Sequence, residues 1–232
     1  NSGEPFTAVV SATSLNFNSV EIHVRPGGEG NRPKVELGPV PHGYAEVKNE
    51  ATVVAGSKKS LSVRPVKVNG NKETFTLTGS IGRDAAPAIV YATASLPESY
   101  LAHAFAALLR KEGIAVAQDY GGTSTAPPGD LPVVARQEGG PLLENVRLFN
   151  TFSNNFMTEQ VFLAFGAASQ GGPASMEKSR KAALEYLKKQ PGCSGAHVEN
   201  GSGLSWNTRI SARCFSETLQ RGYRDFRVFA DL

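Results

Sequence analysis

The chain has 232 residues, of which 40% are apolar and 19% are charged, so it can bury the core of one large domain or two small ones. Its formal charge is only +3 and it has no basic run, which gives no support for a nucleic-acid partner. No stretch approaches the ~20 apolar residues that a transmembrane helix needs, and we expect no transmembrane segment.

Residues 1–92 are predicted to form β structure. Residues 20–25 alternate apolar and polar side chains, as a half-buried strand does, and a Pro-Gly-Gly turn follows them. Asn69-Gly70 separates two alternating runs and is a strong hairpin signal. Strands are expected over residues 20–25, 35–37, 44–47, 61–68, 74–78 and 88–91. We interpret this half as a small, mostly antiparallel β domain.

Residues 93–232 change to the apolar spacing of helices. Helices are expected over residues 99–111, from 141 onward, over 157–165, over 176–189 and from 211 to about 223, with a loop over 121–129 and a short strand over 131–135. Ser95 and Ser175 are the predicted N-caps, and Gly113 and Gly166 are the predicted helix ends. Helices interleaved with a few strands indicate an α/β or α+β arrangement, of which we adopt α+β.

Two polar segments of this second half are candidates for a functional site. Ser153-Asn154-Asn155 precedes a helical run, and Asn200-Gly201-Ser202-Gly203 is followed by Leu-Ser. From the residues alone, the first is most simply the polar start of a helix, because Ser and Asn are favoured N-caps. The second is most simply an ordinary turn.

The order and spacing of several segments resemble the D-alanyl-D-alanine carboxypeptidase/endopeptidase family of class C penicillin-binding proteins. In that family a helix ending in Gly-Ile-x-Val precedes a Pro-Leu helix, a Ser-x-Asn motif and a Gly-Ser-Gly-Leu-Ser segment. The corresponding residues here are 113–116, 141–142, 153–155 and 201–205. The resemblance implies that residues 1–92 form an accessory β domain. Residues 93–232 would then belong to a penicillin-binding/β-lactamase-like serine transpeptidase domain.

The resemblance further implies serine acyl transfer, in which Ser-x-x-Lys, Ser-x-Asn and Lys-Thr-Gly motifs converge on one cleft. Ser153 would relay a proton to the departing D-alanine. Asn155 would orient the substrate amide, because its side chain offers both a donor and an acceptor. Gly201, Ser202 and Gly203 would line the substrate cleft. The implied partners are peptidoglycan stem peptides and β-lactams, without a cofactor or metal, in the periplasm or another extracytoplasmic location.

Two of the three motifs are not found in these 232 residues. The one Ser-x-x-Lys, Ser175 to Lys178, follows Ser153, whereas the family's nucleophile precedes the inserted domains. No lysine is followed by Ser or Thr and then Gly. We therefore expect the chain to be an interior part of a longer enzyme and to be inactive alone. The alternative is a non-catalytic relative that binds peptidoglycan without cutting it.

The cysteines, the tryptophan and the histidines allow three further predictions. Cys193 and Cys214 could form a disulfide or remain buried thiols. Trp206, the only tryptophan, is expected to pack rather than to contact substrate. The histidines lack the spacing of metal ligands and are expected to be satisfied surface or strand residues. They are His23, His42, His103 and His197.

Overall fold

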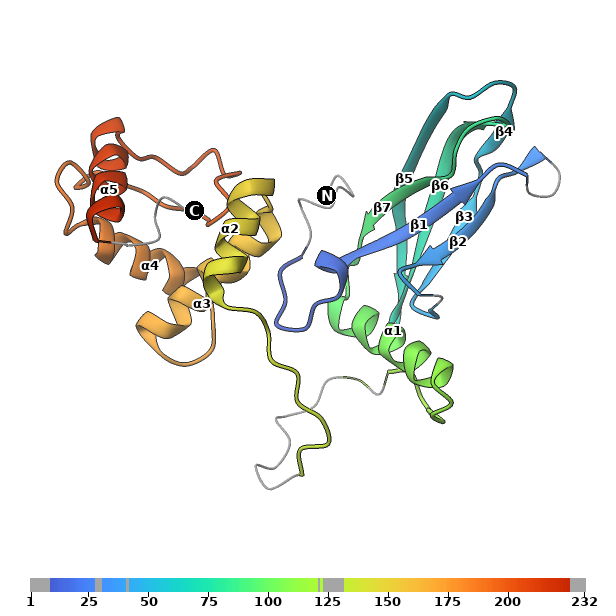
Figure 1. Cartoon of the computed structure of the whole chain (residues 1–232), viewed down its shortest axis with the longest axis horizontal. Coiled ribbons are helices and arrows are strands. Elements are labelled where there is room, and N and C mark those ends of the chain that lie inside the picture. Colours follow the sequence, from blue (N-terminus) through green and yellow to red (C-terminus); the bar gives the residue numbers. More distant parts are fainter. Residues whose placement is uncertain (1–8, 28–30, 41, 121, 123–131, 226–232) are drawn as a thin grey trace. The chain divides into compact units, whose positions relative to one another are not determined.

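The computed structural model describes residues 9–27, 31–40, 42–120, 122 and 132–225. The chain divides into two compact units, Asn1–Pro132 and Val133–Leu232 (Figure 1). This division comes later than the domain boundary expected after residue 92, because the first helix packs with the strands that precede it. The assignment of residues 93–232 to one catalytic domain stays a prediction.

The first unit is a β structure with one long helix. Its elements are the short 3-10 helix η2 (Asn16–Asn18), β1 (Ser19–Arg25), β2 (Lys34–Gly38), β3 (Ala45–Asn49), β4 (Thr52–Val54), β5 (Lys59–Asn69), β6 (Lys72–Gly82), β7 (Ala88–Thr93) and α1 (Pro97–Lys111). All six predicted strands are present, whereas the short strand β4 was not predicted.

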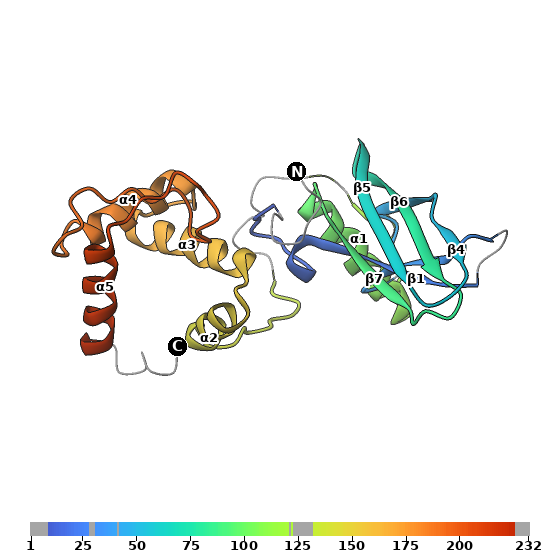
Figure 2. The same cartoon turned by 90° about the horizontal axis from the view of Figure 1, so that it is seen from above.

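The strands of this unit form two sheets. In the first, β1 pairs antiparallel with β2 on one side and β7 on the other. In the second, β6 pairs antiparallel with β5, as the Asn69-Gly70 hairpin predicted (Figure 2). It also pairs parallel with β3 and β4. Three of the five pairings between described strands are antiparallel. The prediction of a mostly antiparallel domain was correct, but no feature of the sequence indicated the two parallel pairings.

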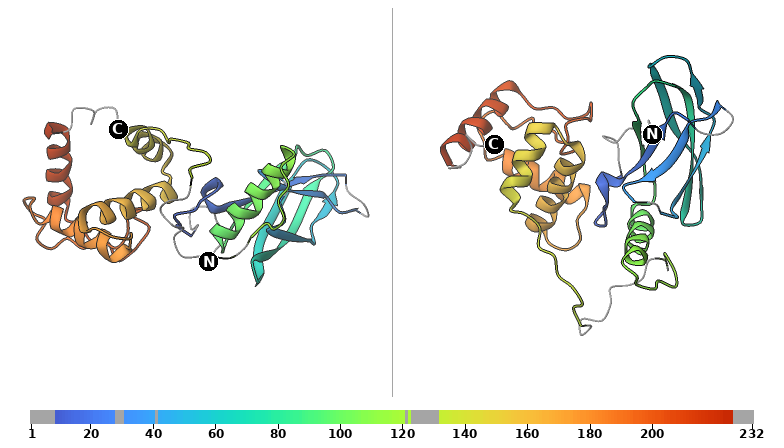
Figure 3. Two further views of the ribbon diagram at one scale, coloured as in Figure 1. Left: turned by 90° about the horizontal axis from the view of Figure 1, so that it is seen from below. Right: turned by 45° about the vertical axis from the view of Figure 1, so that its right-hand side comes forward.

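The core of this unit is formed by the strands of both sheets, with a contribution from helix α1, which lies beside the sheets in Figure 3. The alternation in β1 buries Val20, Ile22 and Val24 completely. Tyr100 of α1 belongs to the same buried cluster, and its hydroxyl donates a 3.1 Å hydrogen bond to the carbonyl of Ser19. These contacts explain why α1 is part of the β unit.

A buried carboxylate joins β6 to the start of α1. Glu73, 2% exposed, accepts hydrogen bonds from the Tyr44 hydroxyl at 2.7 Å and from the backbone N–H and hydroxyl of Ser95 at 3.0 and 2.7 Å. The predicted N-cap at Ser95 was therefore wrong: Leu96 occupies that position, and the Ser95 side chain satisfies Glu73 instead. A buried carboxylate needs such donors, because desolvation otherwise makes its charge costly.

Two buried tyrosines make the stability of this unit sensitive to alkaline pH. Burial raises the pKa of Tyr100, with a further contribution from the charge of Glu21, and burial together with the Glu73 hydrogen bond raises the pKa of Tyr44. Above pH ~10 the unfolded chain releases tyrosine protons that the folded chain keeps, so the free energy of unfolding falls as pH rises. Urea unfolding between pH 8 and 11 should show this loss.

The Tyr100→Phe variant should lose less stability than the wild type over the same pH range. The control is Tyr91→Phe, since Tyr91 is 41% exposed and its variant should follow the wild-type pH dependence. Equal slopes for Tyr100→Phe and the wild type would contradict the assignment.

The second unit is helical. Its elements are α2 (Leu142–Phe152), α3 (Asn155–Gln170), α4 (Met176–Leu187) and α5 (Ala212–Asp225). The four predicted helices are present, and Ser175 is the N-cap of α4, as expected. Gly166 lies inside α3 and does not end it, so that prediction was wrong. Residues 132–135 form no strand, which contradicts the strand predicted there. Leu131 and most of the predicted loop over 121–129 lie outside the described residues.

A disulfide connects α5 to the segment after α4. Cys193 and Cys214 are bonded, and both are buried in a small cluster with Leu187 and Val198. The bond resolves the alternative that the sequence left open. Among the residues that the structure describes, no helix is long and apolar enough to cross a membrane.

Candidate functional site

The Ser-x-Asn segment forms the junction between α2 and α3. Ser153 ends α2, Asn154 is the N-cap of α3, and Asn155 is the first residue of that helix. The Asn154 side chain accepts a 3.0 Å hydrogen bond from the backbone N–H of Met157. Helix capping therefore explains Asn154 but neither Ser153 nor Asn155. Neither of those two side chains has a hydrogen-bond partner within the part of the chain that the structure describes.

Ser153 adopts an unusual backbone conformation. Its φ of 51° and ψ of 43° place it in the left-handed region, where glycine is the favoured residue at the end of a helix. The side chain is exposed, so no packing contact requires a serine there. Strained backbone of this kind is often found at functional positions.

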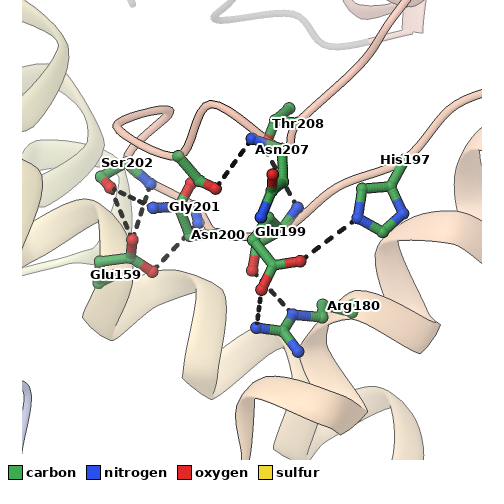
Figure 4. A network of polar contacts seen from close by, with 10 residues as sticks. Glu159, Arg180, His197, Glu199, Asn200, Gly201, Ser202, Asn207 and Thr208 are labelled. Atoms are coloured by element: carbon green, nitrogen blue, oxygen red, sulfur yellow. Dashed lines mark hydrogen bonds and ion pairs between the residues drawn. The ribbon is translucent and has the colours of Figure 1, made fainter.

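The second candidate segment, residues 200–203, is held against α3 by one carboxylate. Glu159 lies one helical turn after Asn155 and accepts three hydrogen bonds from the turn (Figure 4). The donors are the backbone N–H of Gly201 at 3.1 Å, the backbone N–H of Ser202 at 3.2 Å and the hydroxyl of Ser202 at 2.6 Å. The structure thus brings the turn to the helix that begins with the Ser-x-Asn segment.

Close backbone packing also fixes this turn. A Cβ atom at Gly201 would lie 2.6 Å from the Cβ of Phe162 and 3.1 Å from the carbonyl oxygen of Thr158, so only glycine fits between the turn and α3. Gly203 has a φ of +74°, which a glycine adopts without strain. Both glycines of the segment therefore have a structural reason, in addition to any role in a cleft.

A second carboxylate, that of Glu199, holds residues 197–199, which directly precede the turn. Glu199 forms an ion pair with Arg180 of α4, whose Nε also donates a 2.8 Å hydrogen bond to the Glu199 carbonyl (Figure 4). The backbone N–H of Glu199 donates to the hydroxyl of Thr208 at 3.1 Å. Residues 197 and 209 exchange backbone hydrogen bonds of 2.8 Å. The turn is thereby tied to α3 on one side and to α4 on the other.

Ser175 is a helix cap and not a nucleophile. Its hydroxyl oxygen accepts a hydrogen bond from the backbone N–H of Lys178. The Lys178 ammonium donates to the carbonyls of Gly171 at 2.7 Å and Pro173 at 2.9 Å, and so it is engaged away from the Ser175 hydroxyl. A lysine used in this way does not serve as the base of a Ser-x-x-Lys pair.

Trp206 and His103 differ from what the sequence led us to expect. Trp206 is 94% exposed and does not pack against the described part of the chain. His103 is a buried helical residue, with its Nδ1 2.8 Å from the carbonyl oxygen of Ser99. Neither Glu159 nor Arg180 was predicted from the sequence to be part of a site. The one available signal was the spacing of Glu159, four residues after Asn155, which puts both on one helix face.

Comparison with known proteins identifies the family. Residues 1–227 match the model of the D-Ala-D-Ala carboxypeptidase 3 (S13) family. The chain is 33% identical over 201 residues to the D-alanyl-D-alanine carboxypeptidase of Actinomadura sp. (strain R39), which covers 83% of this chain and 35% of that relative.

The fold is that of penicillin-binding protein 4. Two structures of penicillin-binding protein 4 (dacB) from Haemophilus influenzae, one in complex with a β-lactam, match at 18% identity with TM-scores of 0.66 and 0.68. They cover 97% and 98% of this chain, which spans 51% and 50% of theirs. The chain thus spans about a third of the curated relative and about half of the solved ones. It belongs to the D-Ala-D-Ala carboxypeptidase 3 (S13) family.

Proposed function

We propose that the protein is a serine-type D-Ala-D-Ala carboxypeptidase or endopeptidase that acts on peptidoglycan stem peptides through an acyl-enzyme. Its location would be the periplasm or another extracytoplasmic compartment, and β-lactams would acylate the same nucleophile. The nucleophile is a serine outside these 232 residues. Ser153, Asn155 and the turn over 201–203 would form one wall of the site.

The observation that carries this proposal is that one residue of the Ser-x-Asn segment caps α3 and the other two do not. Asn154 alone caps α3, which leaves the Ser153 hydroxyl and the Asn155 amide available for other partners. A hydroxyl can accept and donate a proton in turn, as a relay requires, and an amide can bind both the N–H and the C=O of a peptide. Membership of the family supports the reaction class.

These groups would assist a reaction that they cannot carry out alone. Ser153 would pass a proton to the leaving D-alanine, and Asn155 would hold the substrate amide in line for attack. Both effects depend on a nucleophile and base, because such constellations act as a unit. We therefore expect no turnover from residues 1–232 by themselves.

Labelling with fluorescent penicillin tests the proposal. The full-length gene product should form a covalent adduct that survives a denaturing gel, and its Asn155→Ala variant should be acylated about 100-fold more slowly, as is typical when a positioned group is lost. The control is Asn145→Ala, which removes an amide from the first turn of α2 and should leave the rate unchanged. A gene product that takes up no label would instead favour a non-catalytic peptidoglycan-binding relative. Wild-type acylation in Asn155→Ala would remove this residue from the mechanism.

A further inference from the structure

We infer that Glu159 is a positioning residue of this site: its carboxylate fixes the turn over residues 200–203 to the helix that begins with Asn155. The inference rests on the proposed function, because the turn is proposed to line the same cleft. Glu159 itself does not contact the reacting atoms. It would act through the turn, by keeping the two segments of the wall in one arrangement.

The carboxylate has the number of acceptors that the turn requires. Its Oε2 accepts from the Gly201 N–H at 3.1 Å, and its Oε1 accepts from both the N–H and the hydroxyl of Ser202, at 3.2 and 2.6 Å. Two of these donors belong to the backbone, so they are present whatever side chains occupy the turn. Hydrogen bonds to an ionised acceptor are shorter and stronger than those between neutral groups.

A neutral amide cannot replace this carboxylate. Glutamine has the same shape, but only one of its two terminal atoms accepts hydrogen bonds. If its oxygen faced Ser202, its NH₂ group would face the N–H of Gly201, and two donors would oppose each other. The turn would then move or lose a hydrogen bond, although the helix carrying the residue is unchanged.

The placement of Glu159 links this contact to the site. Asn155 and Glu159 are four residues apart on α3 and therefore lie on one face of the helix. The turn is packed so closely on α3 that Gly201 has no room for a side chain beside Phe162. A shift of the turn would therefore change its position relative to Asn155. Displacements of about 1 Å in a site can slow a reaction about 100-fold.

The test is Glu159→Gln in the full-length gene product, with acylation by fluorescent penicillin followed over time. Two quantities are measured separately: the fraction of protein that becomes labelled, and the rate constant of that fraction. We expect the labelled fraction to stay near that of the wild type and the rate constant to fall roughly 10- to 100-fold. The matched control is Glu185→Gln, because Glu185 of α4 accepts a 2.9 Å hydrogen bond from the exposed side chain of Gln170, outside the turn. Its rate constant should not change.

A double-mutant cycle with Ser202→Ala identifies the route of the effect. Because both changes remove the bond between Glu159 and the Ser202 hydroxyl, the double variant should be acylated faster than the product of the two single effects predicts. Independent effects would overturn the inference, as would a loss confined to the labelled fraction, which means that Glu159 only supports folding. Ser153→Ala separates the two proposals. If it is slow while Glu159→Gln reacts at the wild-type rate, only the positioning role fails; if both react at the wild-type rate, the proposed site fails.

Discussion

Replacing Ser153 by glycine is expected to slow acylation by penicillin about 100-fold in the full-length gene product, yet to raise the free energy of unfolding by about 1 kcal/mol. The rate falls because the proposed proton relay is the hydroxyl that glycine lacks. The stability rises because Ser153 ends α2 with a φ of 51°, a left-handed conformation that disfavours any residue with a Cβ atom. Acylation time courses and urea unfolding measure the two effects.

The Ser153→Ala variant separates the hydroxyl from the backbone. Alanine removes the relay but keeps the Cβ atom, so its acylation should be as slow as that of the glycine variant, without the gain in stability. Asn31→Gly is the matched control for the backbone effect. Asn31 is an exposed residue of the β unit with a φ of 64°, and glycine there should leave the acylation rate unchanged. Wild-type acylation in both Ser153 variants would exclude the relay, and a destabilised Ser153→Gly would contradict the account of the backbone.

Such a result would indicate that Ser153 is kept for function and not for stability. At a helix end in the left-handed conformation, glycine gives the most stable protein. Proteins keep residues that lower stability at positions where function requires them. From the sequence, Ser153 and Asn155 could not be distinguished from N-caps, because cap assignment depends on which residue precedes the first helical turn. The structure assigns the cap to Asn154.

Local patterns predicted the elements of the fold well, and long-range contacts were not predictable. The alternation in β1 and the Asn69-Gly70 turn act within a few residues, and both predictions were confirmed. The parallel pairing of β3 and β4 with β6 joins strands far apart in the sequence, for which no turn provides a signal. The same reason explains why Glu159 was missed: its partners in the turn lie more than 40 residues later in the chain.

Gly166 illustrates how a local rule can fail. A glycine after a helical run usually indicates its end, because glycine is a poor helix former and a good C-cap. Here α3 continues through Gly166 to Gln170. The glycine is needed at this position because α4 packs closely against α3 there. A Cβ atom at Gly166 would lie 2.5 Å from the backbone nitrogen and 2.6 Å from the Cα of Ser179, which is completely buried.

Gly166→Ala should therefore lower the free energy of unfolding by about 1–3 kcal/mol, the usual cost of overpacking a tight interface. Helix propensity alone predicts the opposite sign, because alanine is favoured over glycine in a helix by about 1 kcal/mol. The sign of the change thus decides between local preference and packing. Urea unfolding of the purified protein measures it.

Two further variants test the cause of the loss. Ser169→Ala, at an exposed position of the same helix, changes propensity without adding a contact and should be neutral or slightly stabilising. Adding Ser179→Gly to Gly166→Ala should not restore stability, because two of the three nearest atoms belong to the backbone of residue 179 and remain.

The residue after Ser179, Arg180, holds Glu199 beside the candidate site, so displacing α4 should also slow acylation by penicillin. A stabilised Gly166→Ala would mean that the two helices separate at little cost, and it would contradict the account of close packing at this position.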